Sequence, residues 1–353
     1  MRLGITYLSI SPSVDRASAR QKYLEFGRQV EWANDKGFAG IWVTEHHFSG
    51  YSLSSSPLLL LGHAASLAPD LRIGTGILVL PLWDPVRLVA DVNSLDQLSG
   101  GRLDLGIGRG YQPHEFLGFG RDLESSRAAY EESVDLALRL LTETEVTHKG
   151  EFHRIDAPVS VLPPSFQAPH PPVWAAAVSP ESTRHAVRRG FHLLGLALST
   201  PEEVAEQWRT VAALAAEEGV AAQGRQYAVN RFVHVGTDPA GRRAAAREVA
   251  RQIQTSRALA QGAYPTGGVP PIPAAIDPAD EELAYQRLLA GSPEQIVEQL
   301  RELAAAGVTQ VNAAFEYGTL PAETAFASMR LFASDVIPAL AEQPVADRAV
   351  PAS

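Results

Sequence analysis

The chain of 353 residues contains no cysteine, which excludes disulfide bonds, thiolate metal ligands and a thiol nucleophile together. It also lacks a long apolar run, because the longest one, "PLLLLGHAASLA", is too short and too interrupted to span a bilayer. The N-terminal "MRLGITYLSI" has no continuous apolar core of the kind found in signal peptides. We therefore expect a cytoplasmic protein without a membrane partner.

Positive charge is scarce as well. Thirty Lys and Arg residues stand against 40 Asp and Glu residues, so the net charge is -10 at pH 7, and the basic residues are scattered along the chain. A nucleic-acid surface requires clustered basic residues, and we expect no such partner. The hydrophobic share of 45% and the charged share of 20% are typical of an ordinary globular protein.

Short apolar or β-branched segments alternate with amphipathic, helix-like segments along most of the chain. Such alternation, with several strands apolar on both faces, is typical of a parallel sheet covered by helices. Eight repeats of the unit favour a closed (β/α)8 TIM barrel of the α/β class over an open sheet. The eight predicted strands are residues 2–8, 40–43, 71–77, 102–108, 172–178, 191–196, 226–235 and 308–315.

Helix starts carry a repeated signal, namely a capping residue followed by proline at the first helical position. This pair occurs at Asp84-Pro85, Ser179-Pro180, Thr200-Pro201, Asp238-Pro239, Asp277-Pro278 and Ser292-Pro293.

Two stretches exceed what a minimal barrel needs. Residues 147–172 lie between the fourth and fifth strands, and residues 261–282, rich in proline and glycine, follow the seventh. Long insertions in compact barrels are usually functional loops or mobile segments. We expect a single domain over residues 1–340, a mobile lid or a surface excursion at 261–282, and a C-terminal tail at 341–353.

The motif "TEHHF" places His46 and His47 where the second strand ends. Strand ends of this kind face the active-site mouth of a βα barrel, and neighbouring side chains point to opposite faces. At least one histidine should therefore face the mouth, as a base, a proton donor or a metal ligand. The alternative is a histidine packed at the barrel rim. The pair is contiguous rather than spaced for metal binding, so we expect no metal.

Other strand ends carry patterns that suit an anion or a flat ligand. Arg109 lies among three glycines in "GIGRGYQPHEF", and a guanidinium can fork onto a phosphate. Ser179 and Ser182 begin a helix in "VWAAAVSPESTRHA", where free backbone N–H groups bind phosphate. Gly76, in "RIGTGILVLPLWDPV", permits close approach of a ligand. The alternatives are a tight turn with a surface arginine, an ordinary helix cap and a sharp bend.

Taken together, "GFAGIWVTEHHF", "LRIGTGILVLPLWDPVRLVADVNSLDQLSGGRLDLGIGRGYQPHEFLGFG" and "PVWAAAVSPESTRHAVRRG" resemble the bacterial luciferase-like flavin monooxygenases, and the alpha subunit type most closely, from residue 1 to about residue 215. The resemblance implies a barrel with an insertion after strand 7. It also implies site roles: a histidine near the reactive edge of the flavin and its neighbour (His46, His47), a non-proline cis peptide against the ring (Gly76-Ile77), an acidic position near the pocket (Glu115), and phosphate ligands (Arg109, Ser179, Ser182).

The resemblance further implies an FMN-dependent monooxygenase. Reduced FMN would come from a separate reductase, react with O2 to a C4a-peroxyflavin and oxygenate a small organic substrate, with His46 managing a proton; a homodimer is expected. Gly108 replaces the cysteine of the light-emitting alpha subunit, so we expect a substrate other than that of bioluminescence. Two alternatives remain: hydride transfer with the deazaflavin F420, and a non-catalytic flavin-binding protein.

Overall fold

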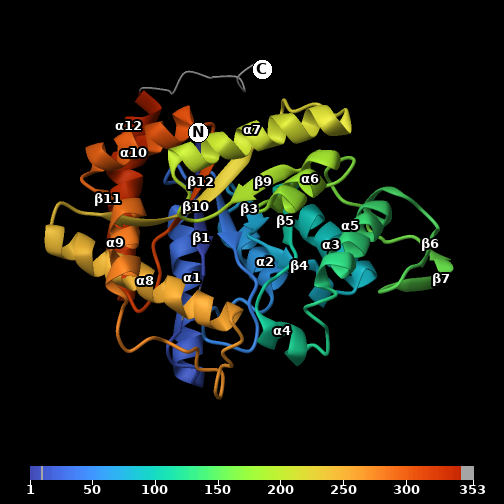
Figure 1. The fold of residues 1–353 in the computed structure, drawn as a ribbon, viewed down its shortest axis with the longest axis horizontal. Helices are drawn as coiled ribbons and strands as arrows, with labels where there is room; N and C mark the ends of the chain where they lie inside the picture. The colour runs from blue at the N-terminus through green and yellow to red at the C-terminus, as the bar shows by residue number, and fades with distance from the viewer. Residues whose placement is uncertain (9–10, 343–353) are drawn as a thin grey trace.

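The computed structural model describes residues 1–8 and 11–342 and shows a closed parallel barrel of eight strands ringed by helices (Figure 1). Each barrel strand pairs in parallel with the next, and a pairing between β9 and β10 closes the ring. All eight predicted strands are therefore confirmed. They are, in barrel order, β1 Arg2–Tyr7, β2 Gly40–Val43, β3 Arg72–Thr75, β5 Leu103–Gly108, β8 Val173–Ala176, β9 His192–Gly195, β10 Tyr227–Val235 and β12 Gln310–Ala314.

The helices begin where the capping pairs predict. Each of the six capping side chains accepts a hydrogen bond from a backbone N–H of its helix's first turn. The helices are α1 Arg16–Ala33, α2 Pro57–Leu67, α3 Pro85–Ser99, α4 Pro113–Gly118, α5 Ser126–Thr142, α6 Pro180–Arg188, α7 Pro201–Glu218, α8 Pro239–Ala260, α9 Pro278–Arg287, α10 Pro293–Ala305, α11 Ala322–Leu331 and α12 Ile337–Glu342, with a 3-10 turn η1 at Leu80–Leu82 and a π-helix η2 at Phe332–Val336.

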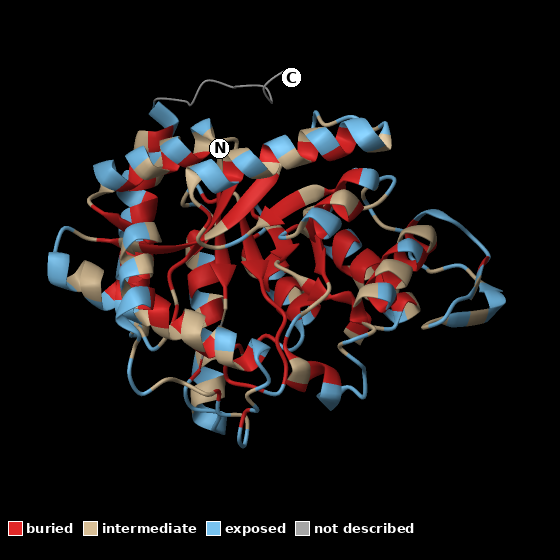
Figure 2. Ribbon diagram, in the orientation of Figure 1, coloured by how far each residue is buried: buried red, intermediate tan, exposed pale blue. Residues whose placement is uncertain are grey.

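The strands alternate between a face toward the helices and a face toward the barrel interior. On β1, Leu3, Ile5 and Tyr7 pack into the main apolar core between sheet and helices. Gly4 lies on the other face, where an added Cβ would come within 2.7 Å of the Asn312 side chain. Figure 2 shows the result: the barrel strands are largely buried, and the helices are buried mainly on their inner sides.

Two tryptophans fill the barrel interior. The rings of Trp42 and Trp174 meet edge to face with centroids 5.5 Å apart. The indole Nε1–H of Trp174 donates to Asp104 Oδ1 at 3.2 Å. Gly74 on β3 leaves room for this packing, because an added Cβ would lie 2.6 Å from Trp42. The two rings belong to a small apolar cluster with Leu194 and Ala228.

Several elements lie outside the predicted units. A two-residue strand, β4 (Leu78–Val79), pairs with β5, and β11 (Leu289–Gly291) extends the sheet beside β10. The first insertion forms an antiparallel hairpin, β6 (Val146–Lys149) and β7 (Arg154–Val159), which projects at the right of Figure 1.

The second insertion is shorter than predicted, because its residues 278–282 form the start of α9. The remaining loop, 261–277, packs beside the barrel mouth. The N–H of Gly50 donates to the carbonyl of Gly268 at 2.7 Å. A small cavity beside it is lined by Tyr51, Gln252, Thr255, Pro270, Ile272 and Thr319. That this loop moves as a lid stays a prediction, and residues 343–353 of the predicted tail lie outside the described residues.

Candidate active site at the barrel mouth

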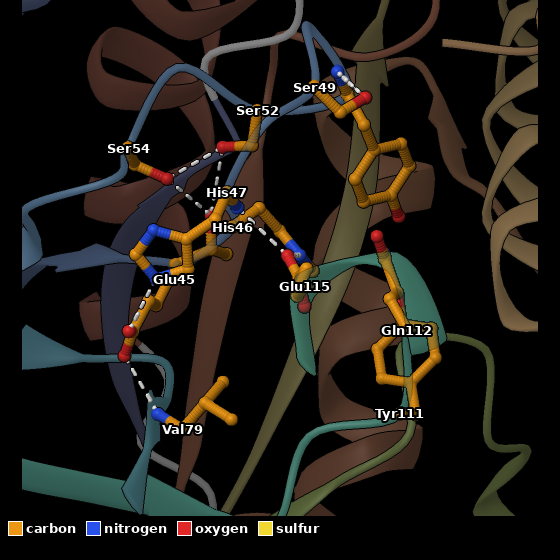
Figure 3. A network of polar contacts seen from close by, with 12 residues as sticks. Glu45, His46, His47, Ser49, Ser52, Ser54, Val79, Tyr111, Gln112 and Glu115 are labelled. Carbon is orange, nitrogen blue, oxygen red and sulfur yellow. Dashed lines mark hydrogen bonds and ion pairs between the residues drawn. The ribbon is translucent and has the colours of Figure 1, made fainter. Parts of the chain in front are cut away.

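The peptide that follows β2 continues the alternation of the strand, and this separates the two histidines. Trp42 faces the barrel interior, so the positions with the parity of 42, 44 and 46 face inward. Glu45 and His47 point to the opposite side, where His47 Nε2 lies 2.7 Å from Glu45 Oε1. His46 is therefore the histidine that the fold turns toward the mouth (Figure 3).

Glu115 on α4 holds His46 from behind. Its Oε1 lies 3.0 Å from His46 Nδ1 and also accepts the backbone N–H of His47 at 2.8 Å. Burial works to raise the pKa of Glu115, but the hydrogen bond and charge of His46 and the His47 N–H outweigh it and lower that pKa. An ionised Glu115 accepts a hydrogen bond from Nδ1–H, so Nε2 of His46 is left for chemistry.

His114 completes the clamp on this peptide. Its Nε2–H donates to the carbonyl of His47 at 3.2 Å, so both backbone polar groups of residue 47 are bound by consecutive side chains of α4. Burial lowers the pKa of His114, which favours the neutral ring that this hydrogen bond needs. α4 thus positions the histidine motif.

Two tyrosines form an aromatic notch around His46. The ring of Tyr51 lies edge to face at 4.8 Å between centroids, and that of Tyr111 at 6.2 Å. The Tyr111 hydroxyl lies 3.0 Å from the hydroxyl of Ser256 on α8 and accepts the Gln112 amide N–H at 3.1 Å. These contacts connect the mouth to the helix that precedes the 261–277 loop.

The segment between β3 and β4 contains a cis peptide bond at Gly76-Ile77, the non-proline cis bond that the resemblance implies. Hydrogen bonds to β2 and the residues after it lie on both sides of the cis bond: the N–H of Gly76 donates to the carbonyl of Val43 at 2.8 Å, and the N–H of Val79 donates to Glu45 Oε2 at 2.7 Å. An added Cβ at Gly76 would meet only Trp42, at 3.7 Å.

Two glycines near Arg109, Gly106 and Gly108, are explained by close packing between strands rather than by the approach of a ligand. An added Cβ on Gly108 would lie 2.7 Å from Ile77 Cδ1, and one on Gly106 would lie 1.9 Å from the Thr75 carbonyl oxygen. Neighbouring strands already occupy this space. These glycines therefore allow β5 to approach β3 and β4 closely.

A second cation, Arg127, lies near Arg109. Arg109 donates to the Ser126 hydroxyl at 2.9 Å. Burial and the charge of Arg127 lower the pKa of Arg109, while the charge of Glu181 opposes that shift. Arg127 lies 3.6 Å from the Glu181 carboxylate. Two guanidinium groups and one exposed carboxylate thus meet at the start of α6. No sequence motif indicates Arg127, which lies in the first turn of α5.

Ser179 and Ser182 form a capping box at the same helix start. Ser179 Oγ accepts the N–H of Ser182 at 3.2 Å, and Ser182 Oγ accepts the N–H of Ser179 at 2.9 Å. Both hydroxyls therefore shape the helix end, as the cap alternative predicted, and phosphate binding by either one stays a prediction. Among residues 1–8 and 11–342, no group of three or more His, Asp or Glu side chains is arranged to hold a metal ion.

The four strand ends that carry these groups are consecutive in the barrel. His46 follows β2, Gly76 follows β3, Arg109 follows β5 and Ser179 follows β8, and these strands are neighbours in that order. The profile of the family described as luciferase-like monooxygenase matches residues 1–310. The chain belongs to this family.

Curated relatives of this luciferase-like chain match a little over half of it. The oxygenase component of the flavin-dependent trigonelline monooxygenase of Acinetobacter baylyi is 31% identical over 195 residues, 55% of this chain and 54% of that one. An alkanal monooxygenase alpha chain of Photorhabdus luminescens is 32% identical over 198 residues, 55% and 53% of the two chains. The chain thus spans about half the length of the curated relatives it matches.

Solved structures match almost the whole luciferase-like barrel. The monooxygenase RslO1 from Streptomyces bottropensis has a TM-score of 0.79 at 26% identity, over 96% of this chain and 99% of that one. The oxygenating constituent of 3,6-diketocamphane monooxygenase of Pseudomonas putida, solved with FMN, has a TM-score of 0.76 at 20% identity, over 96% and 98%. An F420-dependent secondary alcohol dehydrogenase shares the fold with a TM-score of 0.73 at 18% identity, over 96% and 98%. No helix among residues 1–8 and 11–342 is long and apolar enough to cross a membrane.

Proposed function

We propose that the chain is the oxygenase of a two-component monooxygenase that uses reduced FMN and O2 on a small organic substrate. The observation that carries the proposal is the row of groups on four consecutive strand ends, with a proton-handling histidine at one end and a double-arginine anion site at the other. Strands about 4.8 Å apart place β2 and β8 about 14 Å apart along the rim, which suits a flat ring joined to a phosphate.

The anion end supports FMN by its chemistry. Arg109 and Arg127 supply two cations, and the start of α6 supplies the positive end of a helix dipole beside its serine hydroxyls. Glu181 is the carboxylate that partly neutralises the pair through Arg127. A phosphate dianion would replace this weak, exposed contact with charge-assisted bonds to both guanidinium groups.

The ring end assigns tasks to the chain's own residues. Gly76 and Ile77 would lie against the ring, and Tyr51 and Tyr111 would exclude water from the side of His46. Bound reduced FMN would supply the electrons for activation of O2. His46 would accept or return a proton at Nε2, while Glu115 keeps the other nitrogen protonated.

A separate reductase is part of the proposal, because the trigonelline relative is itself named as an oxygenase component. Hydride transfer with F420 is the second candidate, favoured by the fold shared with an F420-dependent dehydrogenase. The same anion site and histidine would serve it, so the choice between flavins is an experimental one.

Binding and re-oxidation of photoreduced FMN test the proposal. The protein should bind reduced FMN under anaerobic conditions, and after mixing with air it should slow the return of the oxidised-flavin absorbance relative to free FMN. His46→Ala should retain FMN binding within about threefold, since the phosphate contacts lie at β5 and β8, and should lose incorporation of heavy-isotope oxygen into a panel of aldehydes and ketones. No binding of reduced FMN, or tight binding of F420 instead, would contradict the proposal.

A further inference from the structure

The sequence alone offers no role for Glu45 of "TEHHF", yet its buried carboxylate accepts several hydrogen bonds on the side of the β2 chain that faces away from the mouth. Its side chain is 1% exposed. It accepts hydrogen bonds from Val79 N–H at 2.7 Å and from Trp83 Nε1–H at 3.0 and 3.1 Å, and it lies 2.7 Å from His47 Nε2. The Val79 and Trp83 groups can only donate, and a carboxylate has enough acceptor sites to accept a third hydrogen bond from His47 Nε2–H.

These contacts connect two parts of the site, the backbone of residues 45–47 and the segment around Gly76-Ile77. Residues 45 and 47 are two apart on the same face, so the bond between their side chains immobilises the backbone of His46 between them. Val79 follows the Gly76-Ile77 segment directly after Leu78, and its bond to Glu45 ties that segment to the same backbone. Trp83 secures the chain after η1 to the same carboxylate.

We propose that Glu45 is a positioning residue that holds the His46 imidazole and the Gly76-Ile77 segment in one fixed arrangement. Glu115 orients the His46 ring from the α4 side, and Glu45 fixes the backbone that carries it from the β4 side. Glu45 itself points away from the mouth and touches neither reacting group. The link to flavin chemistry rests on the proposed function; the positioning itself does not.

Glu45→Gln tests the proposal with little change in volume. One amide oxygen cannot serve the donors that two carboxylate oxygens serve, and its NH2 group faces at least one of them. We expect the His47 ring, followed by nitrogen NMR on histidine-labelled protein, to move its proton from Nε2 to Nδ1. The Nδ1 proton of His46 should exchange with solvent at least about tenfold faster, the factor expected when one buried hydrogen bond is lost.

Glu132→Gln is a matched control, because Glu132 also binds a histidine and a row of N–H groups, but far from the mouth. Its carboxylate lies 2.9 Å from His148 Nε2 and accepts the N–H groups of Glu151, Phe152 and His153 at 3.0, 3.1 and 2.9 Å. We expect Glu132→Gln to lower stability while leaving the His46 proton exchange unchanged. Equal exchange rates of the His46 Nδ1 proton in wild type and Glu45→Gln would mean that Glu45 contributes to stability alone, and would overturn the proposal.

The flavin arm separates the two proposals. With reduced FMN, Glu45→Gln should speed flavin re-oxidation toward the rate of free flavin while FMN affinity stays within about threefold, since the arginines are untouched. If wild type does not bind reduced FMN, the proposed function fails, and the NMR arm still decides the role of Glu45. Should Glu45→Gln not fold, Trp83→Phe removes a single donor and should give a smaller increase in His46 exchange; no increase would overturn the proposal.

Discussion

At the scale of single residues, the two histidines of "TEHHF" differ in role because their side chains point to opposite sides of one strand. Each has its own carboxylate, Glu115 for His46 and Glu45 for His47. The inward histidine keeps a free nitrogen at the mouth, and the outward one is part of the frame. Glu115 contacts His46 and the backbone of His47, which agrees with the position near the pocket that the resemblance implies; binding of the cofactor by Glu115 stays a prediction.

Two substitutions at the proposed anion site should change FMN affinity in opposite directions. Arg127→Ala should weaken FMN binding by about 10- to 100-fold, because a charge-assisted hydrogen bond contributes about 1.5–3 kcal/mol. Glu181→Gln should leave binding unchanged or tighten it, because it removes the carboxylate that competes for Arg127. Quenching of FMN fluorescence on titration measures both. Arg139→Ala, which removes an exposed pair with Glu143 and a hydrogen bond to the Thr147 carbonyl, serves as the control and should bind as wild type does.

The lowered pKa of Glu115 predicts a pH dependence of stability. Its folded pKa is below the ordinary 4.5, so its contribution is fully present above pH 4.5 and is lost as pH falls through the folded value. The difference in free energy of unfolding between wild type and Glu115→Gln should therefore be constant above about pH 5 and shrink at more acidic pH. Urea unfolding at a series of pH values checks this. A difference that grows toward acidic pH would show the sign to be wrong.

At the scale of elements, glycines in strand and helix carry different constraints. Gly74→Ala should lower the free energy of unfolding by about 1–3 kcal/mol, because its Cβ would overlap Trp42 inside the barrel. Gly62→Ala in α2 should raise it by about 0.5–1 kcal/mol, because an added Cβ there meets only Leu95 at 3.8 Å and alanine favours the helix. Thermal and urea unfolding of both variants decide the matter; destabilisation by Gly62→Ala would contradict this account.

The loops show a second effect at this scale. α4 is only six residues long, yet His114 and Glu115 bind both backbone groups of residue 47, and Tyr111 just before it reaches Ser256 on α8. One connection thus links the histidine motif to the helix that leads into the 261–277 loop. We expect movement of that loop to change the contacts of Tyr51 and Tyr111.

At the scale of the whole molecule, the homodimer stays a prediction from the family resemblance. The described surface offers two strongly exposed leucines on neighbouring helices, Leu59 on α2 at 74% and Leu98 on α3 at 79%. We expect the double variant Leu59→Glu, Leu98→Glu to sediment as a monomer while wild type sediments as a dimer, because charge in an apolar interface is costly. Leu24→Glu on α1 is the control. A monomeric wild type would contradict the prediction.

Local patterns sufficed for much of the fold and for part of the site. Strand alternation and the capping pairs act over a few residues, so the eight barrel strands and six helix starts could be read from the chain itself. The short strands β4 and β11 could not, because their residues become strands only by pairing with β5 and β10. The predicted insertion extends to residue 282, although the Asp277-Pro278 pair marks the start of α9, because the proline-rich composition of this stretch favours a loop.

The sequence by itself therefore determined which side chains stand at the mouth, since any barrel strand ends there. Only the tertiary structure decided which histidine faces inward, which carboxylate each one meets and which second arginine joins Arg109. Apart from the local pair of His47 with Glu45, these outcomes depend on contacts between distant parts of the chain, such as His46 with Glu115 across 69 residues and Arg109 with Ser126 across 17. Such contacts leave no periodicity in the sequence, because they arise from packing between elements rather than from the conformation of any one of them.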